Sequence, residues 1–425
     1  MRISTVRAVN ALTTHWAGHA ATGGAGTVFT AAGVWPLLAL LADGAAGPAR
    51  TELAEALGIP ADRAAGAARE LLGALDGVRG LRAATGLWTR RELPLEEGWT
   101  ERLPPGTRGT LTGDGAADRE ALDAWAVDRT GGLVERMPVE VDEDTRLVLA
   151  SALALRLRWI QPFHPCFAMP EEGPWAHRPL LGLCRSTALL DRVRVAQAPT
   201  GPVTVLEVVG DSGVDVHLVL GEPQAAAGPT LQAAIAAVTR ALPSTGASLL
   251  PEGNPGPGLR IGTVGSTEPR HRLDIETVAF DVRAEHDLLT PAALFGLESA
   301  SDNRYGHFPG ISSEDLAVAS ARQSALARFH AEGFEAAAVT AVAVGAGGCA
   351  MPRLRYRVRR AQVTFDRPFG FVAVHRTSRL VLAAGWVTQP AAHVEEEEYT
   401  EEEKRRQEEE WYAEEDFPGP ATLSG

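Results

Sequence analysis

The spacing of hydrophobic residues changes its period along the chain. Apolar residues recur at helical spacing over residues 8–58 and 118–135, whereas residues 203–220 alternate in the manner of strands. The stretch 147–159 is nearly all apolar, with arginines only at its end. Such a run is expected of a central strand covered on both faces. The pattern therefore predicts both helices and strands.

Shorter elements complete the prediction. Thr51 and Gly58 are expected to cap and close a short amphipathic helix. Residues 243–270 are rich in Pro and Gly and are expected to form a loop. The other predicted elements are strands at 81–89, 278–282 and 353–363, a short helix at 287–297, a compact turn at 308–312, and hairpins at 203–209 with 214–220 and 369–374 with 380–387.

The turn of the first hairpin, Gly210–Gly213, has the sequence Gly-Asp-Ser-Gly, which also surrounds the nucleophile of chymotrypsin-like proteases. Val214 follows it where those enzymes have Gly-Pro, and no Ala-Ala-His-Cys-like motif precedes it. The sequence assembles no set of nucleophile, base and orienting group. A simple turn is therefore favoured over a hydrolase site.

Residues 332–342 can form either a loop or a strand. An acidic pair flanks Gly333, a row of small side chains follows, and the glycine-rich stretch 345–348 comes next. Small side chains suit a strand that must enter between two strands of a completed sheet, although an alanine run is also typical of a helix. Alternate residues of such a strand would face opposite sides: Phe334, Ala336, Ala338 and Thr340 on one, and Glu335, Ala337, Val339 and Ala341 on the other.

Composition and charge limit the class of protein. The 425 residues carry no apolar run long enough to span a bilayer, and the first residues lack the apolar core of a signal peptide, so a cytoplasmic location is expected. Of the net charge of −14, residues 391–425 contribute −10. This acidic tail is expected to be disordered and solubilising, with binding of a basic partner as the alternative. Cys166, Cys184 and Cys349 have unrelated spacings and are expected to be free thiols, not a disulfide framework or a zinc site.

Several landmarks occur in the order found in one known family. Each of them matches a stretch of that family's conserved pattern: Phe29–Val34, the glycine turn 44–47 with Thr51-Glu52 and Leu57-Gly58, Asp123–Gly132, Leu147–Ala152 with Trp159 and Pro162-Phe163, Phe308–Ser312, Glu332–Ala338, and Asp366–Phe369 with Gly385–Val387. Together they resemble the serpins over about residues 5–390. The resemblance implies one α+β domain, residues 1–390, with three β-sheets, about nine helices and an exposed reactive-centre loop.

The resemblance also implies a mechanism of suicide inhibition. A serine protease cleaves the exposed loop of the metastable fold, and the loop then inserts into the central sheet and carries the acylated protease with it. The loop length places the cleaved bond at Gly347-Gly348, which suits an elastase-like or subtilisin-like protease. The implied hinge comprises Glu332, Gly333, Phe334, Glu335, Ala336, Ala337, Ala338, Val339 and Thr340. No catalytic residue, cofactor, metal, nucleic acid or membrane is implied, and a monomer is expected.

Some positions depart from the family's pattern. Phe334 replaces a small residue at the first position to enter the sheet, which is expected to slow insertion by overpacking. The sheet-opening region that the resemblance implies comprises Thr30, Gly33, Ser151, Trp159 and Gln323, and its polar cluster appears here as Thr30, Gly33, Ser151 and Gln323. A non-inhibitory serpin that binds a protein partner is therefore the alternative function. Cys349, beside the expected cleaved bond, is interpreted as an incidental thiol, with a redox switch as the alternative.

Overall fold

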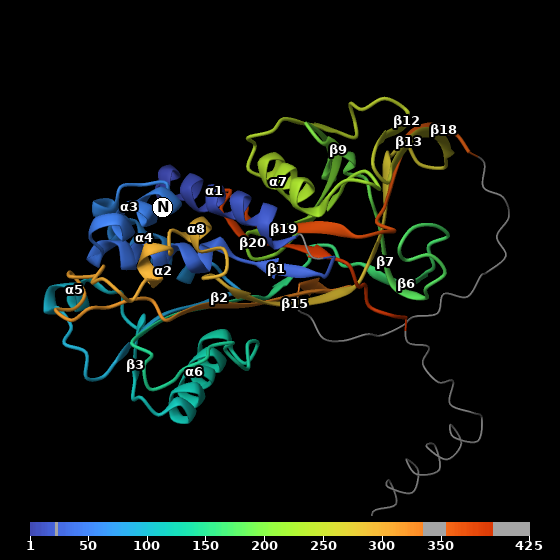
Figure 1. The fold of residues 1–425 in the computed structure, drawn as a ribbon. Coiled ribbons are helices and arrows are strands. Elements are labelled where there is room, and N and C mark those ends of the chain that lie inside the picture. The colour runs from blue at the N-terminus through green and yellow to red at the C-terminus, as the bar shows by residue number, and fades with distance from the viewer. Residues whose placement is uncertain (22–23, 335–353, 394–425) are drawn as a thin grey trace, which may run out of the picture.

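The computed structural model describes residues 1–21, 24–334 and 354–393. Three β-sheets, with most of the helices gathered at one end, build this part of the chain (Figure 1). Its eight α-helices are α1 (Ile3–Ala20), α2 (Ala31–Gly44), α3 (Gly47–Leu57), α4 (Ala61–Asp76), α5 (Glu97–Arg102), α6 (Gly115–Thr130), α7 (Ala227–Val238) and α8 (Ala292–Phe295), with 3₁₀ turns at Leu190–Arg192 and Ser299–Ser301.

The central sheet has the order β3-β2-β4-β16-β17-β5, and β15 pairs along the other edge of β16. Its strands β4 and β16 run parallel as direct neighbours. The strand bounds are β2 (Leu81–Arg90), β3 (Arg108–Leu111), β4 (Leu147–Leu155), β5 (Leu157–Arg158), β15 (Phe280–Asp287), β16 (Ser320–Phe329) and β17 (Gly333–Phe334).

Two further sheets lie beyond the central one. The second sheet has the order β1-β20-β19-β10-β9-β8-β11, and the third has the order β12-β13-β18-β14-β7-β6. The strands of the second sheet are β1 (Thr27–Phe29), β8 (Val193–Ala198), β9 (Gly201–Val209), β10 (Val214–Leu220), β11 (Ser244–Gly246), β19 (Phe369–His375) and β20 (Val381–Val387). Those of the third are β6 (His164–Ala168), β7 (Leu180–Thr187), β12 (Gly253–Gly256), β13 (Leu259–Ser266), β14 (Arg272–Val278) and β18 (Tyr356–Thr364).

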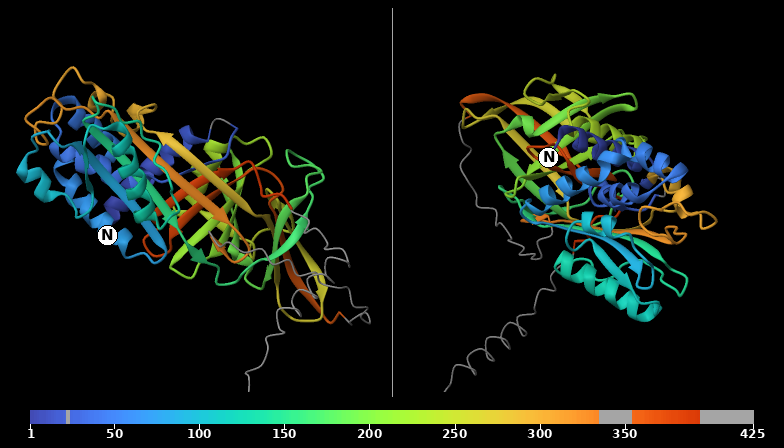
Figure 2. Two further views of the ribbon diagram at one scale, coloured as in Figure 1. Left: turned by 90° about the horizontal axis from the view of Figure 1, so that it is seen from below. Right: turned by 90° about the vertical axis from the view of Figure 1, so that its left-hand side faces the viewer.

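Strand β4 is covered on both faces, as its apolar run predicts. Every residue of the strand is buried, and alternate residues join two separate cores. Leu149 and Leu153 belong to the large core beneath α2, whereas Val148 belongs to a smaller core that includes Leu122 of α6. Figure 2 shows α6 on one side of the sheet and the N-terminal helices on the other. Because successive side chains of β4 point to opposite faces of the sheet, the strand contributes residues to both cores.

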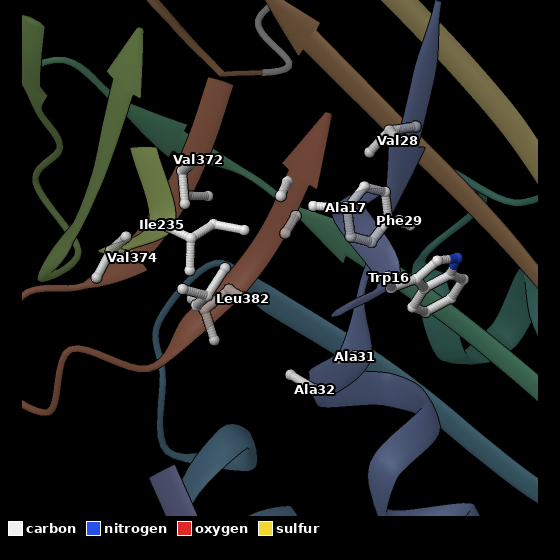
Figure 3. Close-up of a cluster of buried hydrophobic side chains, with 14 of the residues drawn as sticks. Trp16, Ala17, Val28, Phe29, Ala31, Ala32, Ile235, Val372, Val374 and Leu382 are labelled. Atoms are coloured by element: carbon white, nitrogen blue, oxygen red, sulfur yellow. The ribbon is translucent and has the colours of Figure 1, made fainter. Parts of the chain in front are cut away.

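The large core joins the helices to the second sheet. Figure 3 shows Trp16 of α1 beside Phe29 of β1, with Ile235 of α7 lying near Leu382 of β20. The ring centroids of Trp16 and Phe29 are 5.0 Å apart, and both side chains are almost fully buried. Aromatic side chains of this size contribute a large share of the buried apolar area.

Four of the predicted elements are wrong in their type or bounds. Residues 243–270 contain β11, β12 and β13 instead of one loop, because β11 pairs with β8 and β13 pairs with β18, and both of these partners lie outside the segment. Helix α3 begins at Gly47, with Thr51 inside it, although Gly58 closes it in the left-handed conformation as expected. Helix α6 stops before Gly131, and the helix predicted at 287–297 shortens to α8.

The expectation of free thiols is also wrong for two of the cysteines. Cys166 and Cys184 form a disulfide between the antiparallel neighbours β6 and β7 of the third sheet. Their spacing in the sequence shows no such pairing, because it results from the register of two strands. Cys349 lies outside the described residues.

Candidate reactive-loop hinge

The start of the predicted loop already belongs to the central sheet. Gly333 and Phe334 form β17, which pairs with Phe329 of β16 on one side and with Leu157 and Arg158 of β5 on the other. The chain reverses between β16 and β17, where the His330 amide donates to the carbonyl of Gly333 at 2.9 Å. The first two residues of the loop are therefore held between two strands.

The residues after β5 fix this reversal. The backbone amide of Trp159 donates to the carbonyl of Glu332 at 2.9 Å, and its indole Nε1 donates to the carbonyl of His330 at 2.9 Å. The amide of Phe163 donates to the carbonyl of Ala331 at 2.8 Å. Trp159 thus binds the reversal through both its backbone and its side chain.

Gly333 stands where a side chain has no room. A Cβ atom at this position would lie 2.2 Å from the carbonyl oxygen of Leu157, far inside van der Waals contact. Because the obstacle is backbone of the neighbouring strand, it cannot rotate away. Glycine at this position lets β17 approach β5 closely enough to pair.

Phe334 is already buried in this structure. Its side chain is 2% exposed, and its ring lies 6.1 Å from that of Phe371 on β19, measured between centroids. The overpacking expected when this ring first enters the sheet therefore does not arise as a later step. The aromatic residue anchors the loop to the core between the central and second sheets.

Beyond β17 the sheet is closed. Strands β4 and β16 pair directly with each other from Val148 opposite Ser320 to Leu153 opposite Ala325. Phe334 sits between Leu157 and Phe329, which are the next positions in the same register. An additional strand that continued β17 would therefore have to separate β4 from β16.

A polar cluster bridges the closed seam between β4 and β16. The Thr30 amide donates to Gln323 Oε1 at 2.8 Å, and Gln323 Nε2 donates to the Thr30 carbonyl at 2.9 Å and to Ser151 Oγ at 3.5 Å. Thr30 also caps α2 by accepting a hydrogen bond from the Gly33 amide, and a Cβ atom on Gly33 would lie 2.5 Å from Ser151 Oγ. The structure thus brings together four residues of the predicted sheet-opening region, whereas the fifth, Trp159, lies at the reversal before β17.

The bond across the seam is the weakest of this cluster. The two bonds between Gln323 and Thr30 are short, whereas the contact of 3.5 Å to Ser151 is at the limit of a hydrogen bond. Separation of β4 from β16 would break that long contact and leave Gln323 with both of its bonds to Thr30.

The remaining predicted site residues lie outside the described residues. They are Glu335, Ala336, Ala337, Ala338, Val339, Thr340, Gly347 and Gly348. The described part of the chain holds no group of three His, Cys, Asp or Glu side chains that could bind a metal, and none of its helices is long and apolar enough to cross a membrane. Gly210–Gly213 forms the turn between β9 and β10, as predicted.

Sequence reasoning missed the residues that receive the loop. Leu157, Arg158 and Phe329 pair with β17, and no motif in the sequence marks them as partners of the loop. The register that joins them to the hinge is a property of three strands. A usable signal was the short distance in sequence between Phe329 and Gly333, which permits only a tight reversal.

Three sheets, with the short strand β17 held between β16 and β5 of the central one, define the class of fold. Residues 11–172 and 265–390 match the family model described as Serpin (serine protease inhibitor). The chain belongs to the serpin family. Comparison with curated proteins gave no match.

Solved structures of similar fold include a serpin, a thyroxine-binding globulin and a protease nexin. A highly specific serpin, Serpin48 of the insect Tenebrio molitor, is 19% identical over 91% of this chain and 98% of its own, with a TM-score of 0.66. Human thyroxine-binding globulin complexed with thyroxine is 16% identical over 92% and 98%, with a TM-score of 0.68. Native protease nexin-1 with heparin is 15% identical over 91% and 99%, also with a TM-score of 0.68. At these identities the likeness shows the shared fold.

Proposed function

We propose that this serpin is a suicide inhibitor of a serine protease, acting through insertion of its cleaved loop into the central sheet. The observation that carries the proposal is the register of β17. Phe334 lies opposite both Leu157 and Phe329, so each later residue of an antiparallel continuation has one defined neighbour on each side.

The residues that follow fit this continued register. Glu335 would lie between Arg156 and Arg328, two cations for one carboxylate. Ala336 and Ala338 would lie beside Leu155 and Leu153, where small side chains are needed next to large ones. The polarity and size of the loop therefore match the strands that would receive it.

Thr340 gives the most specific match. In the continued register it falls between Ser151 and Gln323, on the face of the sheet that carries Phe334. Its hydroxyl would meet the polar cluster at the seam and could replace the long Gln323–Ser151 contact. The register ends with Val344 opposite Leu147, the first residue of β4, so Gly347-Gly348 would remain just beyond the sheet.

The far end of the loop explains why cleavage is needed. Strand β18, which follows the loop, pairs with β13 from Leu259 to Ser266 and with β14 from Arg272 to Glu276. Insertion of an uncleaved loop would pull against both of these partners at once, at a net cost of about 1 kcal/mol for each hydrogen bond lost. A cut between the anchors removes that cost.

The test is incubation with subtilisin and with pancreatic elastase. Inhibition is expected to give an adduct that resists denaturant, together with a sharp rise in melting temperature of the cleaved serpin. Clean cleavage without adduct would instead favour the alternative, a non-inhibitory serpin that binds a partner. A rise in melting temperature without adduct would show that insertion occurs but is too slow to trap the protease.

Matched variants separate insertion from recognition. Ala338→Glu would bury a carboxylate beside Leu153, so we expect cleavage at the normal rate and at least a tenfold loss of adduct. Ala350→Glu adds the same charge on the far side of the proposed cleaved bond and is expected to leave the adduct intact. Equal adduct from both variants would contradict the proposed register.

A further inference from the structure

The charge of the chain is divided between two parts of opposite sign. Residues 394–425 carry thirteen Asp and Glu residues, all between Glu395 and Asp416, against three basic residues. The third sheet reverses this balance, because residues 259–278 and 354–364, which form β13, β14 and β18, carry seven arginines and three carboxylates. A negative tail and a positive sheet therefore belong to one chain, and the proposed inhibition assigns no role to either charge.

Several of these arginines share one face of the third sheet. Arg360 of β18 lies opposite Arg272 of β14. Two residues further along β18, Gln362 lies opposite Arg260 of β13. Because paired residues and every second residue of a strand point to the same side, Arg260, Arg272 and Arg360 project together. The lining of a cavity of about 680 Å³ at this sheet includes Arg270, Arg272 and Arg360.

Most of the positive charge in this region is not neutralised by the described residues. Asp274 accepts hydrogen bonds from Arg272 at 2.5 Å and from Arg360 at 2.6 Å, so one negative charge is shared between two cations. Four further arginines are exposed and form no ion pair with any described residue: Arg260, Arg270, Arg355 and Arg357. Like charges in one region repel each other. An acidic partner would therefore relieve this repulsion as well as add attraction.

The acidic tail leaves the described part of the chain beside the same sheet. The amide of Leu181 on β7 donates to the carbonyl of Ala391 at 2.9 Å. The amide of His393 donates to the carbonyl of Pro179 at 3.2 Å, and its ring lies 5.4 Å from that of Phe167 on β6, measured between centroids. Figure 1 shows β6, β7, β13 and β18 at the end of the molecule away from α3, α4 and α5. The tail thus starts at the third sheet.

The tail is long enough to reach the arginines. Strand β7 has 8 residues, so at about 3.3 Å per residue the sheet extends about 25 Å from the tail exit at Leu180 to Thr187. An extended segment 394–404 reaches at most about 40 Å. The glutamates of residues 401–410 therefore reach Arg270 and its neighbours.

We propose that the acidic tail, residues 395–416, docks on the arginine-bearing face of its own third sheet, over β13, β14 and β18. Charge complementarity holds the contact, and the covalent link raises the effective concentration of the tail at the sheet. Docking neutralises arginines that the described residues leave unpaired, and it keeps other polyanions away from β18, the strand that follows the reactive loop. The contact lies within one chain and does not depend on inhibition.

Lys404 tests the proposal on the full chain. It is the only lysine of the sequence, so a succinimidyl ester that carries a diazirine attaches only to Lys404 and to the amine of Met1. On illumination we expect the label in the tail to crosslink to peptides of β13, β14 and β18. The label at Met1 is the internal control and is expected to crosslink to α4, because the Met1 amine pairs with Glu70 at 3.2 Å. Crosslinks of Lys404 spread evenly over the molecule would overturn the proposal.

Salt and isotope labelling define the contact. Raising the salt concentration from about 0.15 M to about 1 M shortens the Debye length from about 8 Å to about 3 Å, so we expect the tail crosslinks to fall about fivefold or more. Equal crosslinking at both salt concentrations would contradict an electrostatic contact. A mixture of normal and isotope-labelled chains is expected to give links within one chain. Links of mixed mass as the main product would assign the tail to a second copy and overturn the proposal.

Matched variants locate the surface. Removal of the four unpaired arginines is expected to lower the tail crosslinks about fivefold or more at an unchanged melting temperature: Arg260→Gln, Arg270→Gln, Arg355→Gln and Arg357→Gln. The control removes the same charge from exposed arginines outside the third sheet and is expected to change the crosslinks less than about twofold: Arg7→Gln, Arg63→Gln, Arg119→Gln and Arg136→Gln. Unchanged crosslinking in the first set, or an equal loss in both sets, would sink the proposal. The salt experiment tests the same contact in the parent protein, without any substitution.

Discussion

The structure has no room for a side chain at Gly333, whereas it buries a large side chain at the next residue, Phe334. Gly333 leaves room for the backbone of β5, whereas Phe334 fills a buried site next to Phe371. The family pattern drew attention to both positions, but their roles follow from the strands on either side. The pairing of β17 thus depends on the lack of a side chain at Gly333, and its burial depends on the large side chain of Phe334.

The first prediction concerns the absent side chain. Gly333→Ala is expected to lower the free energy of unfolding by about 1–3 kcal/mol, because its Cβ would strike the Leu157 carbonyl and push β17 away from β5. Urea unfolding measures the loss. Gly262→Ala is the control, since that strand glycine has no atom within 4 Å of an added Cβ. A similar small effect of both substitutions would contradict the tight approach.

A second prediction at this scale concerns His217. Its pKa is about 4 when folded, against 6.5 for the unperturbed group, so the unfolded chain binds more protons between these pH values. The stability contribution is therefore complete above pH 6.5 and is lost as the pH falls toward 4. The loss amounts to about 3 kcal/mol at most.

The acid sensitivity is measured by urea unfolding at pH 7 and pH 4.5. His217→Leu is expected to lose less stability over this interval than the parent protein, and the difference isolates His217 from the other histidines with a lowered pKa, which are His286, His330 and His375. The charged groups near His217 are Glu207, Asp215, Arg192 and Arg379. Parallel pH profiles of parent and variant would refute the assignment.

At the scale of elements, the pairing of β17 predicts the partners of the whole inserted strand. Glu335→Arg would place three cations together at Arg156 and Arg328, of which Arg328 also pairs with Asp281. We expect about a tenfold fall in adduct, corresponding to about 1.4 kcal/mol on the insertion step. Arg156→Glu combined with Glu335→Arg is expected to restore part of the loss.

Gel analysis of the denaturant-resistant adduct measures both variants. Glu332→Arg is the control, because Glu332 precedes β17 and would not enter between β4 and β16. If Glu332→Arg impairs the adduct as strongly as Glu335→Arg, the register does not hold. If the combined variant recovers nothing, Arg156 is not the neighbour of Glu335.

Elements differed in how well local sequence predicted them. The apolar run of β4 and the strands β9 and β10 were predicted with nearly correct bounds, because apolar residues dominate each of them, although β10 also buries Asp215 and His217. The stretch 243–270 was not, since β13 owes its existence to pairing with β18, about a hundred residues further along the chain. Pairing at that distance leaves no local periodic pattern in a segment rich in glycine and proline.

At the scale of the whole molecule, the disulfide gives the last prediction. Without reductant, the denatured chain is expected to show one reactive thiol, and with reductant three, because Cys166 and Cys184 are joined. Reduction is expected to lower the free energy of unfolding by about 3 kcal/mol, given the sequence separation of 18 between the two cysteines.

Thiol titration and urea unfolding measure these effects. Cys349→Ser should leave the reduction-dependent loss unchanged, whereas Cys166→Ser should abolish it. Three reactive thiols in the unreduced protein would contradict the bond. The same count bears on the cytoplasmic location, which stays a prediction, because disulfides persist mainly in oxidising compartments.

The sequence by itself determined those helices and strands whose own side chains show the expected hydrophobic pattern. The apolar run of β4 and the ordered landmarks of the family are local facts, and the landmarks sufficed to identify the family. A buried strand needs apolar side chains of its own, so its position in the chain can be predicted from its own residues.

Only the tertiary structure decided which residues meet. The contact of Phe334 with Phe371, the hydrogen bonds from Thr30 through Gln323 to Ser151 and the Cys166–Cys184 disulfide each join segments that are separate in sequence. A contact across a sheet depends on register, and one residue of slip would turn every side chain to the opposite face. The register of the strands therefore could not be predicted from the hydrophobic pattern of the sequence and was determined only by the structure.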